Sequence, residues 1–359
     1  MRRIAIAGLA AVACIGQAHA QSNVTLYGSL DDGIAYTSNV GGKSKYYIDS
    51  GEMQPDRWGL RGNEDLGGGN KAVFWLENGF STNTGAALIP SDAWSRIAYV
   101  GLSSEHLGTV TLGMQTPFSS DYLLPFSTSY LNGQFMALHP GNLDELANTG
   151  PVPYDNSIKY VSPTLYGFTG GAILALGNTT NFAHGRNLSF GLNYAMGNFR
   201  AAVAYQVEHN RSPAIAATDF TTFQGMPAPT YQVDKFQEFG AGASYRLFGR
   251  LTLHGLFTWL KLQTNGQVAT WNAYDAGANY DVTHFDTIGI GGSTTELAGR
   301  RYTQLNLNNV YLLSKSTQLY INTYYEHASG NGARAALFTA GVSSGRDQFA
   351  IRMGIHHSF

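Results

Sequence analysis

The chain has 359 residues, of which 13% are charged, and it contains 43 glycines, 21 tyrosines and 19 phenylalanines. Ordinary soluble domains have about 25% charged residues, so this composition argues against a conventional cytosolic enzyme. The formal net charge of −2 shows no basic excess of the kind that accompanies nucleic-acid binding. Beyond the N-terminal segment, no apolar run approaches the roughly 20 residues of a membrane-spanning helix.

Residues 1–20 have the pattern of a cleavable secretory signal peptide. Two arginines precede an apolar stretch, and Ala18 and Ala20 frame a cleavage site. Acylation of Cys14 as a lipoprotein anchor is the alternative interpretation. Because Cys14 is the only cysteine, the mature chain has no thiol, which suits an oxidising compartment. We therefore predict a signal peptide followed by one folded domain, residues 21–359.

From residue 21 onward, polar and apolar residues alternate with a period of two, which is typical of β-strands that face two environments. In the first segment Leu26 and Leu30 share one face, while Tyr27 and Asp31 share the other. Fourteen such segments are clear, and two more are predicted within residues 264–301. Sixteen strands of about ten residues fit the length of the chain, and fourteen strands remain compatible with it.

The connections between these segments also alternate. Short turns are predicted at residues 65–70, 103–108, 162–167, 196–198, 248–250 and 314–316, and longer links at residues 38–52, 81–92, 116–154, 177–186, 209–234 and 329–345. Short turns at one end and long loops at the other predict an all-β fold, a transmembrane antiparallel up-and-down β-barrel of the outer-membrane type. A barrel of sixteen strands is too wide for its side chains to fill, so an aqueous channel is expected.

The link over residues 116–154 is too long for a structureless loop in a compact domain. It carries many apolar side chains, among them Phe118, Tyr122, Phe126 and Phe135. A loop this apolar should pack against another surface, and the inside of the barrel is the nearest one. We therefore predict that this third long loop folds into the pore.

Several motifs together resemble one family, the Gram-negative general porins of the beta-proteobacterial type. The motifs are VTLYG at residues 24–28, RWGLRG at 57–62, EDLGGG at 64–69, RIAYVGL at 96–102, LGTVTLG at 107–113, NSIKY at 156–160 and the C-terminal residues 354–359. The resemblance is dense over residues 21–176 and at the last strand, and weak over residues 209–301.

This resemblance implies a homotrimer of sixteen-stranded barrels in the Gram-negative outer membrane. Lipid and lipopolysaccharide would surround it, and the barrel-assembly machinery would insert it. The implied function is passive diffusion of ions and small hydrophilic solutes through a water-filled channel, with no cofactor and no enzymatic step. A substrate-biased channel is the nearer alternative. A surface adhesin or receptor that acts through long loops at residues 209–234 and 264–301 is the more distant one.

The resemblance also implies a pore constriction between a basic wall and an acidic loop. Arg57 and Arg96 match the wall arginines of the family, and Arg61 follows Arg57 on the same strand face. On the loop, the acidic side is assigned by composition alone. The candidates there are Asp121, Asp144 and Glu145.

Two departures from the family pattern affect the predicted charge of this wall. Pro153 and Asp155 stand where relatives commonly carry a third basic residue, and Met114 stands where many have arginine. With Asp155 on the wall, the expected ion selectivity is weak, nearer neutral or cation-preferring than strongly anion-selective.

The remaining site candidates follow from the alternation of side chains. Tyr27, Asp31, Trp75 and Glu77 should line the pore, although Asp31 and Glu77 could instead hold the arginines, and the two aromatic rings could stack on a ligand. The aromatic residues expected to face lipid are Trp58, Phe74, Tyr99, Tyr160 and Phe359. The terminal Phe359 also resembles an assembly signal of outer-membrane barrels. No metal-ligand spacing such as H-E-x-x-H occurs, so no metal site and no catalytic residue is predicted.

Overall fold

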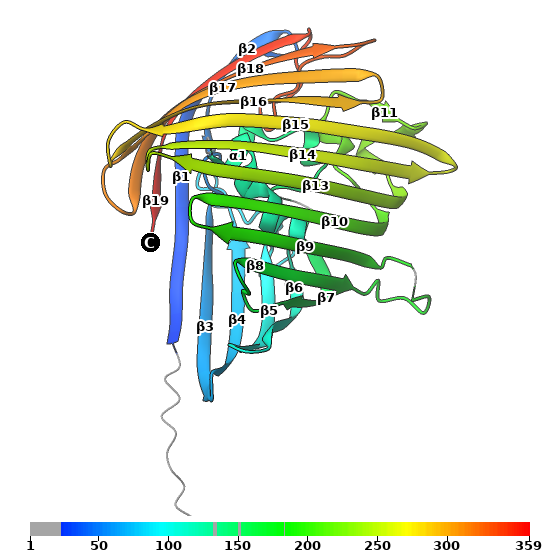
Figure 1. Cartoon of the computed structure of the whole chain (residues 1–359). Coiled ribbons are helices and arrows are strands. Elements are labelled where there is room, and N and C mark those ends of the chain that lie inside the picture. Colours follow the sequence, from blue (N-terminus) through cyan, green and yellow to red (C-terminus); the bar gives the residue numbers. More distant parts are fainter. Residues whose placement is uncertain (1–22, 132–134, 150–151, 183) are drawn as a thin grey trace, which may run out of the picture.

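The computed structural model describes residues 23–131, 135–149, 152–182 and 184–359, and the predicted signal peptide lies outside these residues. The described chain forms one antiparallel sheet that curves into a barrel (Figure 1). Its strands are β1 (Asn23–Val40), β2 (Lys43–Ser50), β3 (Arg57–Gly67), β4 (Asn70–Gly79), β5 (Ile97–Ser104), β6 (Gly108–Gln115), β7 (Tyr154–Val161), β8 (Phe168–Ala175), β9 (Asn187–Met196), β10 (Phe199–Arg211), β13 (Val233–Leu247), β14 (Leu251–Thr264), β15 (Gln267–Asp281), β16 (Asp286–Leu297), β17 (Arg300–Leu312), β18 (Thr317–Ser329) and β19 (Asp347–Ser358).

The sheet closes because β1 pairs with β19, from Ser29 opposite Ser358 to Thr37 opposite Ala350. Figure 1 shows this seam, where the blue first strand runs beside the red last strand. The N-terminal half of β1 pairs on its other side with β3, and the C-terminal half pairs with β2. β2 and β3 therefore share one position, so the 17 strands of the described sheet occupy 17 − 1 = 16 positions. The predicted barrel of sixteen strands is confirmed.

One predicted link is a hairpin, and a region that the adhesin alternative treats as a loop consists of strands. Residues 38–52 do not form a long link, because β1 and β2 continue to a tight turn at Gly41 and Gly42, whose φ angles of 60° and 96° suit glycine. Residues 264–301 hold the two predicted strands, β15 and β16. Short turns at Gly266 and Gly299 bound them, so this region is not a long external loop.

The two faces of the wall differ in polarity. On β17, Leu305 and Leu307 are exposed on the outside, whereas Gln304 and Asn306 are buried on the inside. This is the reverse of a soluble protein and matches a barrel with lipid outside and a polar lumen. Tyr99 was expected to face lipid, which is wrong: its ring contacts Trp75 edge-on and borders an internal cavity.

Residues 116–153 are referred to below as loop 116–153, and the described part of this loop packs inside the barrel, where Phe118, Leu123 and Phe126 are buried against the wall. The short helical segments of the loop are η1 (Ser119–Leu123), η2 (Leu124–Phe126), α1 (Thr128–Leu131), η3 (Phe135–Ala137) and η4 (Pro140–Asn142). Wall glycines allow the loop to approach closely: a Cβ atom at Gly240 would lie only 2.2 Å from Cδ1 of Leu123. Among the described residues, no helix is long and apolar enough to cross a membrane.

A second long link, between β10 and β13, also packs on the inner wall. It contains η5 (Ile215–Ala217), the small hairpin of β11 (Thr222–Phe223) and β12 (Met226–Pro227), and η6 (Ala228–Thr230). Ile215 and Phe223 are buried against Trp271 and Leu260 of the wall, together with Leu143 of loop 116–153. The two links together narrow the open cross-section of the barrel.

Candidate functional site

A cavity of about 270 Å³ lies between loop 116–153 and the inner wall of β3, β4 and β5. Arg57, Glu77 and Arg96 border it from the wall, and Asp121 and Leu124 border it from the loop. These residues come from the RWGLRG and RIAYVGL motifs, the strand between them and the loop. We call this cavity the constriction.

Glu77 is the centre of the charged wall. Its Oε1 lies 2.7 Å from Nε of Arg96, and its Oε2 lies 3.4 Å from Nε of Arg57. The Tyr27 hydroxyl donates a 2.7 Å hydrogen bond to Oε2 and accepts one from the Trp75 indole. Glu77 therefore binds both arginines and also borders the constriction, so it has both of the roles that the sequence analysis left open.

The two arginines differ in how firmly they are held. Nη1 of Arg96 donates a 2.9 Å hydrogen bond to the carbonyl of Asn148 in the loop, and its side chain is only 8% exposed. Arg57 reaches Gln54 and Pro55 at the longer distances of 3.2 to 3.4 Å, and its side chain is 24% exposed. Arg57 is thus the more accessible cation of the site.

Arg61 does not join the constriction. It lies nearer the short-turn end of β3, where its guanidinium is exposed and stands 5.2 Å from the centre of the Tyr27 ring. The predicted third wall arginine is therefore displaced along the channel. The Tyr27 ring lies between Arg61 and Glu77, because it contacts the guanidinium of Arg61 and its hydroxyl binds Glu77.

Asp121 is the predicted loop carboxylate that does border the constriction. It pairs with Nζ of Lys159 on β7 and accepts a 2.6 Å hydrogen bond from the Thr116 hydroxyl. Sequence reasoning missed Lys159, although it belongs to the NSIKY motif. Alternation counted from Ser157, which also faces inward, would have revealed it.

Asp144 and Glu145 face away from the constriction, which contradicts their predicted pore-lining role. Asp144 lies 2.7 Å from Nδ1 of His139 and accepts a 2.8 Å hydrogen bond from Thr258 on β14. Glu145 lies 2.6 Å from Nη2 of Arg211 on β10. Both carboxylates are buried and anchor the loop to the opposite wall.

The surroundings of His139 and Glu145, which anchor the loop to the wall, shift the pKa values of both groups. Burial alone would lower the pKa of His139, but the neighbouring carboxylates of Asp144 and Asp275 raise it to about 10. Burial raises the pKa of the Glu145 carboxyl well above its usual range, against the opposing influence of Arg211.

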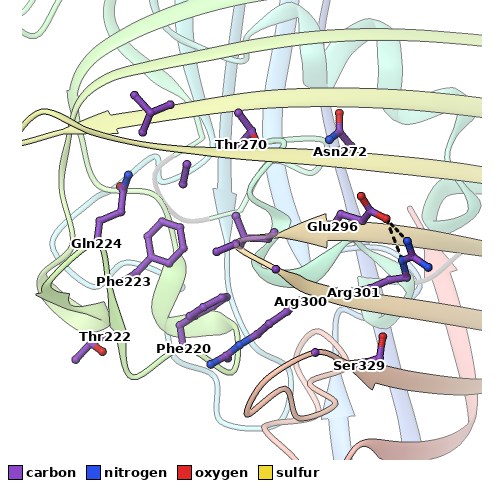
Figure 2. Close-up of a pocket in the computed structure, with 16 residues that line it drawn as sticks. Phe220, Thr222, Phe223, Gln224, Thr270, Asn272, Glu296, Arg300, Arg301 and Ser329 are labelled. Atoms are coloured by element: carbon purple, nitrogen blue, oxygen red, sulfur yellow. Dashed lines mark hydrogen bonds and ion pairs between the residues drawn. The ribbon is translucent and has the colours of Figure 1, made fainter.

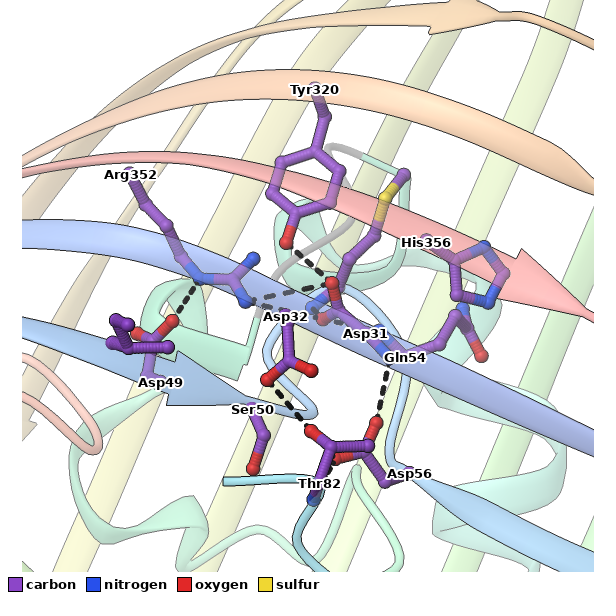
Figure 3. A network of polar contacts seen from close by, with 12 residues as sticks. Asp31, Asp32, Asp49, Ser50, Gln54, Asp56, Thr82, Tyr320, Arg352 and His356 are labelled. Carbon is purple, nitrogen blue, oxygen red and sulfur yellow. Dashed lines mark hydrogen bonds and ion pairs between the residues drawn. The ribbon is translucent and has the colours of Figure 1, made fainter.

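Asp31 is also not pore-lining, because it is completely buried at the seam of the barrel (Figure 3). It accepts hydrogen bonds from the Tyr320 hydroxyl and, at 2.5 Å, from the backbone amide of Met53. Arg352 stands 3.5 Å away and also binds Asp49 at 2.5 Å. The arginine that pairs with Asp31 is therefore Arg352 on β19, and not Arg57 or Arg96 of the constriction.

Asp155 does not stand on the constriction wall. The register between β6 and β7 shifts after Gly113, and Asn156 has a φ of 52°. Because of this irregularity Tyr154 and Ser157 both point inward, whereas Asp155 is exposed near Asp92 in a separate cavity. The assignment of Asp155 to the constriction is wrong.

A larger hollow of about 760 Å³ lies at the long-loop end of the barrel (Figure 2). The Arg300 guanidinium stacks 4.0 Å from the centre of the Phe220 ring and binds Asp219 at 2.7 Å. Figure 2 also shows the neighbouring pair of Arg301 and Glu296. The charges of this hollow are paired with one another, and many of its strand residues lie on the outward face of the wall, because they alternate with the buried Trp271, Leu297 and Tyr302.

Toward the short-turn end of the barrel, the terminal residue Phe359 pairs with Gly28 on β1. The backbone amide of Gly28 donates to the Phe359 carbonyl at 2.9 Å, and the Phe359 amide donates to Gly28 at 3.1 Å. A Cβ atom on Gly28 would lie 2.2 Å from the Phe359 ring, so the ring covers this glycine. Within the described part of the chain, no group of three His, Asp or Glu residues is placed to hold a metal ion.

Comparison with known proteins gives consistent matches. The family model for Gram-negative porins matches residues 5–331. Outer membrane porin protein 32 of Delftia acidovorans is 30% identical, over 98% of this chain and 98% of that protein. An outer membrane porin protein of Bordetella pertussis is 32% identical, over 62% of this chain and 63% of the relative.

Solved structures have the same fold. An anion-selective porin from Comamonas acidovorans superimposes with a TM-score of 0.78 at 26% identity, covering 94% of this chain and 100% of that chain. The trimer form of OmpT from Vibrio cholerae gives a TM-score of 0.68 at 14% identity, over 94% of this chain and 99% of that chain, a likeness of fold alone.

Proposed function

This chain belongs to the Gram-negative porin family and forms an outer-membrane channel for passive diffusion of ions and small solutes, and we propose that the constriction sets its selectivity. The observation that carries this proposal is the pair Arg57 and Arg96 facing loop 116–153 across one cavity. Charges in a narrow pore act on a permeating ion at close range. Passage requires no cofactor and no covalent step.

The charges of the constriction and of the adjoining cavity together favour a weak preference for anions. Arg57, Arg96, Glu77 and Asp121 border the constriction, and Lys159 lies in the adjoining cavity, where it pairs with Asp121. The formal sum over these five groups is 3 − 2 = +1. Asp144, Glu145 and Asp155 lie elsewhere and do not reverse this sum. The Comamonas acidovorans relative is described as anion-selective, which is consistent with the same sign here.

The assembly and its targeting remain proposals. We infer a homotrimer, surrounded by lipid and lipopolysaccharide, because the fold matches a porin solved in a trimer form. Residues 1–20 would direct secretion, and the barrel-assembly machinery would recognise the terminal strand with Phe359. The adhesin alternative is weakened, since residues 264–301 form strands of the wall.

Purified protein in planar bilayers tests the channel function. We expect stepwise insertion of channels with a constant conductance in KCl, and liposome swelling that slows as the added sugar becomes larger. Protein that is folded, as shown by heat-modifiable migration in gels, but does not conduct would contradict the function.

A further inference from the structure

We propose, on the basis of the channel function above, that the constriction prefers small carboxylates with an apolar body over equally charged carboxylates that are fully hydrophilic. The site combines an accessible guanidinium with an apolar lining in one cavity of about 270 Å³. Sites that bind small molecules are commonly apolar with a few placed polar groups. A pore that only sieved hydrophilic solutes would have no need for such a lining.

Six apolar side chains border the cavity while remaining partly exposed to it. They come from residues 51–56, from β4 and from loop 116–153, and are Met53, Pro55, Trp75, Leu124, Tyr130 and Phe135. Behind them, Leu138 and Leu146 are fully buried, so the lining is backed by a packed core. The apolar surface is therefore a fixed part of the wall.

Residues 51–56 are a second inward segment, opposite loop 116–153. They interrupt the strand position shared by β2 and β3. The Asp31 carboxylate fixes the segment by accepting hydrogen bonds from the amides of Met53 and Gln54, at 2.5 and 3.4 Å. On the loop side, the Phe135 amide donates a 2.8 Å hydrogen bond to the Glu52 carbonyl. These hydrogen bonds hold Met53 and Phe135 on neighbouring segments that border the same cavity.

The guanidinium of Arg57 is the group that would bind the carboxylate of the permeating solute. Its contacts to Gln54 and Pro55 are long, whereas Arg96 is committed to Glu77 and to the loop carbonyl of Asn148 by short contacts. A guanidinium can bind a carboxylate through two parallel hydrogen bonds. A solute held in this way places its apolar body against Met53, Trp75 or Leu124.

Reversal potentials with benzoate and acetate test the proposal. Wild-type channels in planar bilayers separate potassium chloride from either potassium benzoate or potassium acetate. We expect the benzoate-to-acetate permeability ratio to exceed the ratio of their free mobilities by about fivefold, the factor expected when about 40 Å² of apolar surface leaves water. A ratio equal to that of the free mobilities would overturn the proposal.

Two nearly isosteric variants locate the preference. Met53→Gln and Leu124→Asn should each move the permeability ratio back toward the ratio of free mobilities. The matched control is Met114→Gln, because Met114 lies in the separate cavity beside Asp155 and should leave the ratio unchanged. An unchanged preference in both constriction variants would contradict the assignment.

The same recordings separate this proposal from the channel function. Conductance in KCl without a preference for benzoate contradicts the carboxylate proposal and leaves the channel function standing. Folded protein without any KCl conductance contradicts the channel function itself.

Discussion

Glu77 on β4 and Arg96 just before β5 are joined by a 2.7 Å contact between Oε1 and Nε, and both side chains are buried at the edge of the constriction. Glu77 also contacts Arg57. One carboxylate therefore offsets part of the charge of two guanidiniums. The selectivity of the channel should depend on Glu77 as strongly as on either arginine.

Replacing Glu77 with Gln should strengthen the preference for anions. A unit charge about 8 Å from the permeating ion contributes about 1 kcal/mol at an effective dielectric constant of about 40, with opposite sign for chloride and for potassium. The chloride-to-potassium permeability ratio should therefore rise by up to about thirtyfold. Reversal potentials in asymmetric KCl measure this ratio. Glu105→Gln, in the short turn between β5 and β6, is the matched control and should leave the ratio close to that of the wild type.

Replacing Arg211 with Gln should destabilise the barrel, because Glu145 and Glu208 each lie 2.6 Å from its guanidinium in a buried cluster. Removing one partner of a buried ion pair typically costs about 3–5 kcal/mol. Urea unfolding followed by tryptophan fluorescence gives the change in the free energy of unfolding. Arg246→Gln removes the exposed pair with Asp281 and should cost at most about 1 kcal/mol. Equal effects of the two substitutions would show that the anchor of loop 116–153 is not critical for stability.

The stability of the barrel should fall as the pH rises from about 6.5 to about 10. Carboxylates next to His139 raise its pKa in the folded protein to about 10, above the ordinary value of 6.5. The stabilisation from protonated His139 is therefore complete below pH 6.5, and it is lost as the pH rises through the folded value. Thermal unfolding of the wild type and of His139→Asn measures the difference. That difference should be largest near pH 6 and shrink toward pH 10; a constant difference would contradict the assignment.

Deleting Phe359 should reduce the amount of assembled barrel. The terminal residue exchanges two backbone hydrogen bonds with Gly28 at the seam. Unpaired backbone groups in lipid cost several kcal/mol each. The heat-modifiable form in outer-membrane fractions measures assembly, and Phe359→Tyr is the conservative control that should restore it. Normal levels of the deletion variant would count against an assembly role.

The sequence predicted the barrel because alternation of side chains and of connections persists over most of the chain. The resemblance to porins assigned Arg57 and Arg96 to the constriction wall, and alternation assigned Glu77 to the inward face; in the structure these three side chains border one cavity. Alternation failed at Asp155, because the shifted register between β6 and β7 changes which residues face inward.

The alternation of side chains could not predict contacts between residues that are far apart in the sequence. Asp31 meets Arg352 across 321 positions of sequence, so its burial could not be distinguished from exposure to the pore. Asp144 and Glu145 lie in a loop without a regular period. Composition alone could not show which way their carboxylates point.

The most direct test of this account is the reversal potential of wild-type channels in asymmetric KCl at low ionic strength, where charges are weakly screened. With a formal sum of +1 over the constriction charges and the adjoining Lys159, chloride should permeate slightly better than potassium. Asp155→Arg should leave this potential nearly unchanged, since Asp155 lies outside the constriction. A potential that favours potassium, or a large shift in Asp155→Arg, would contradict the assignment of charges.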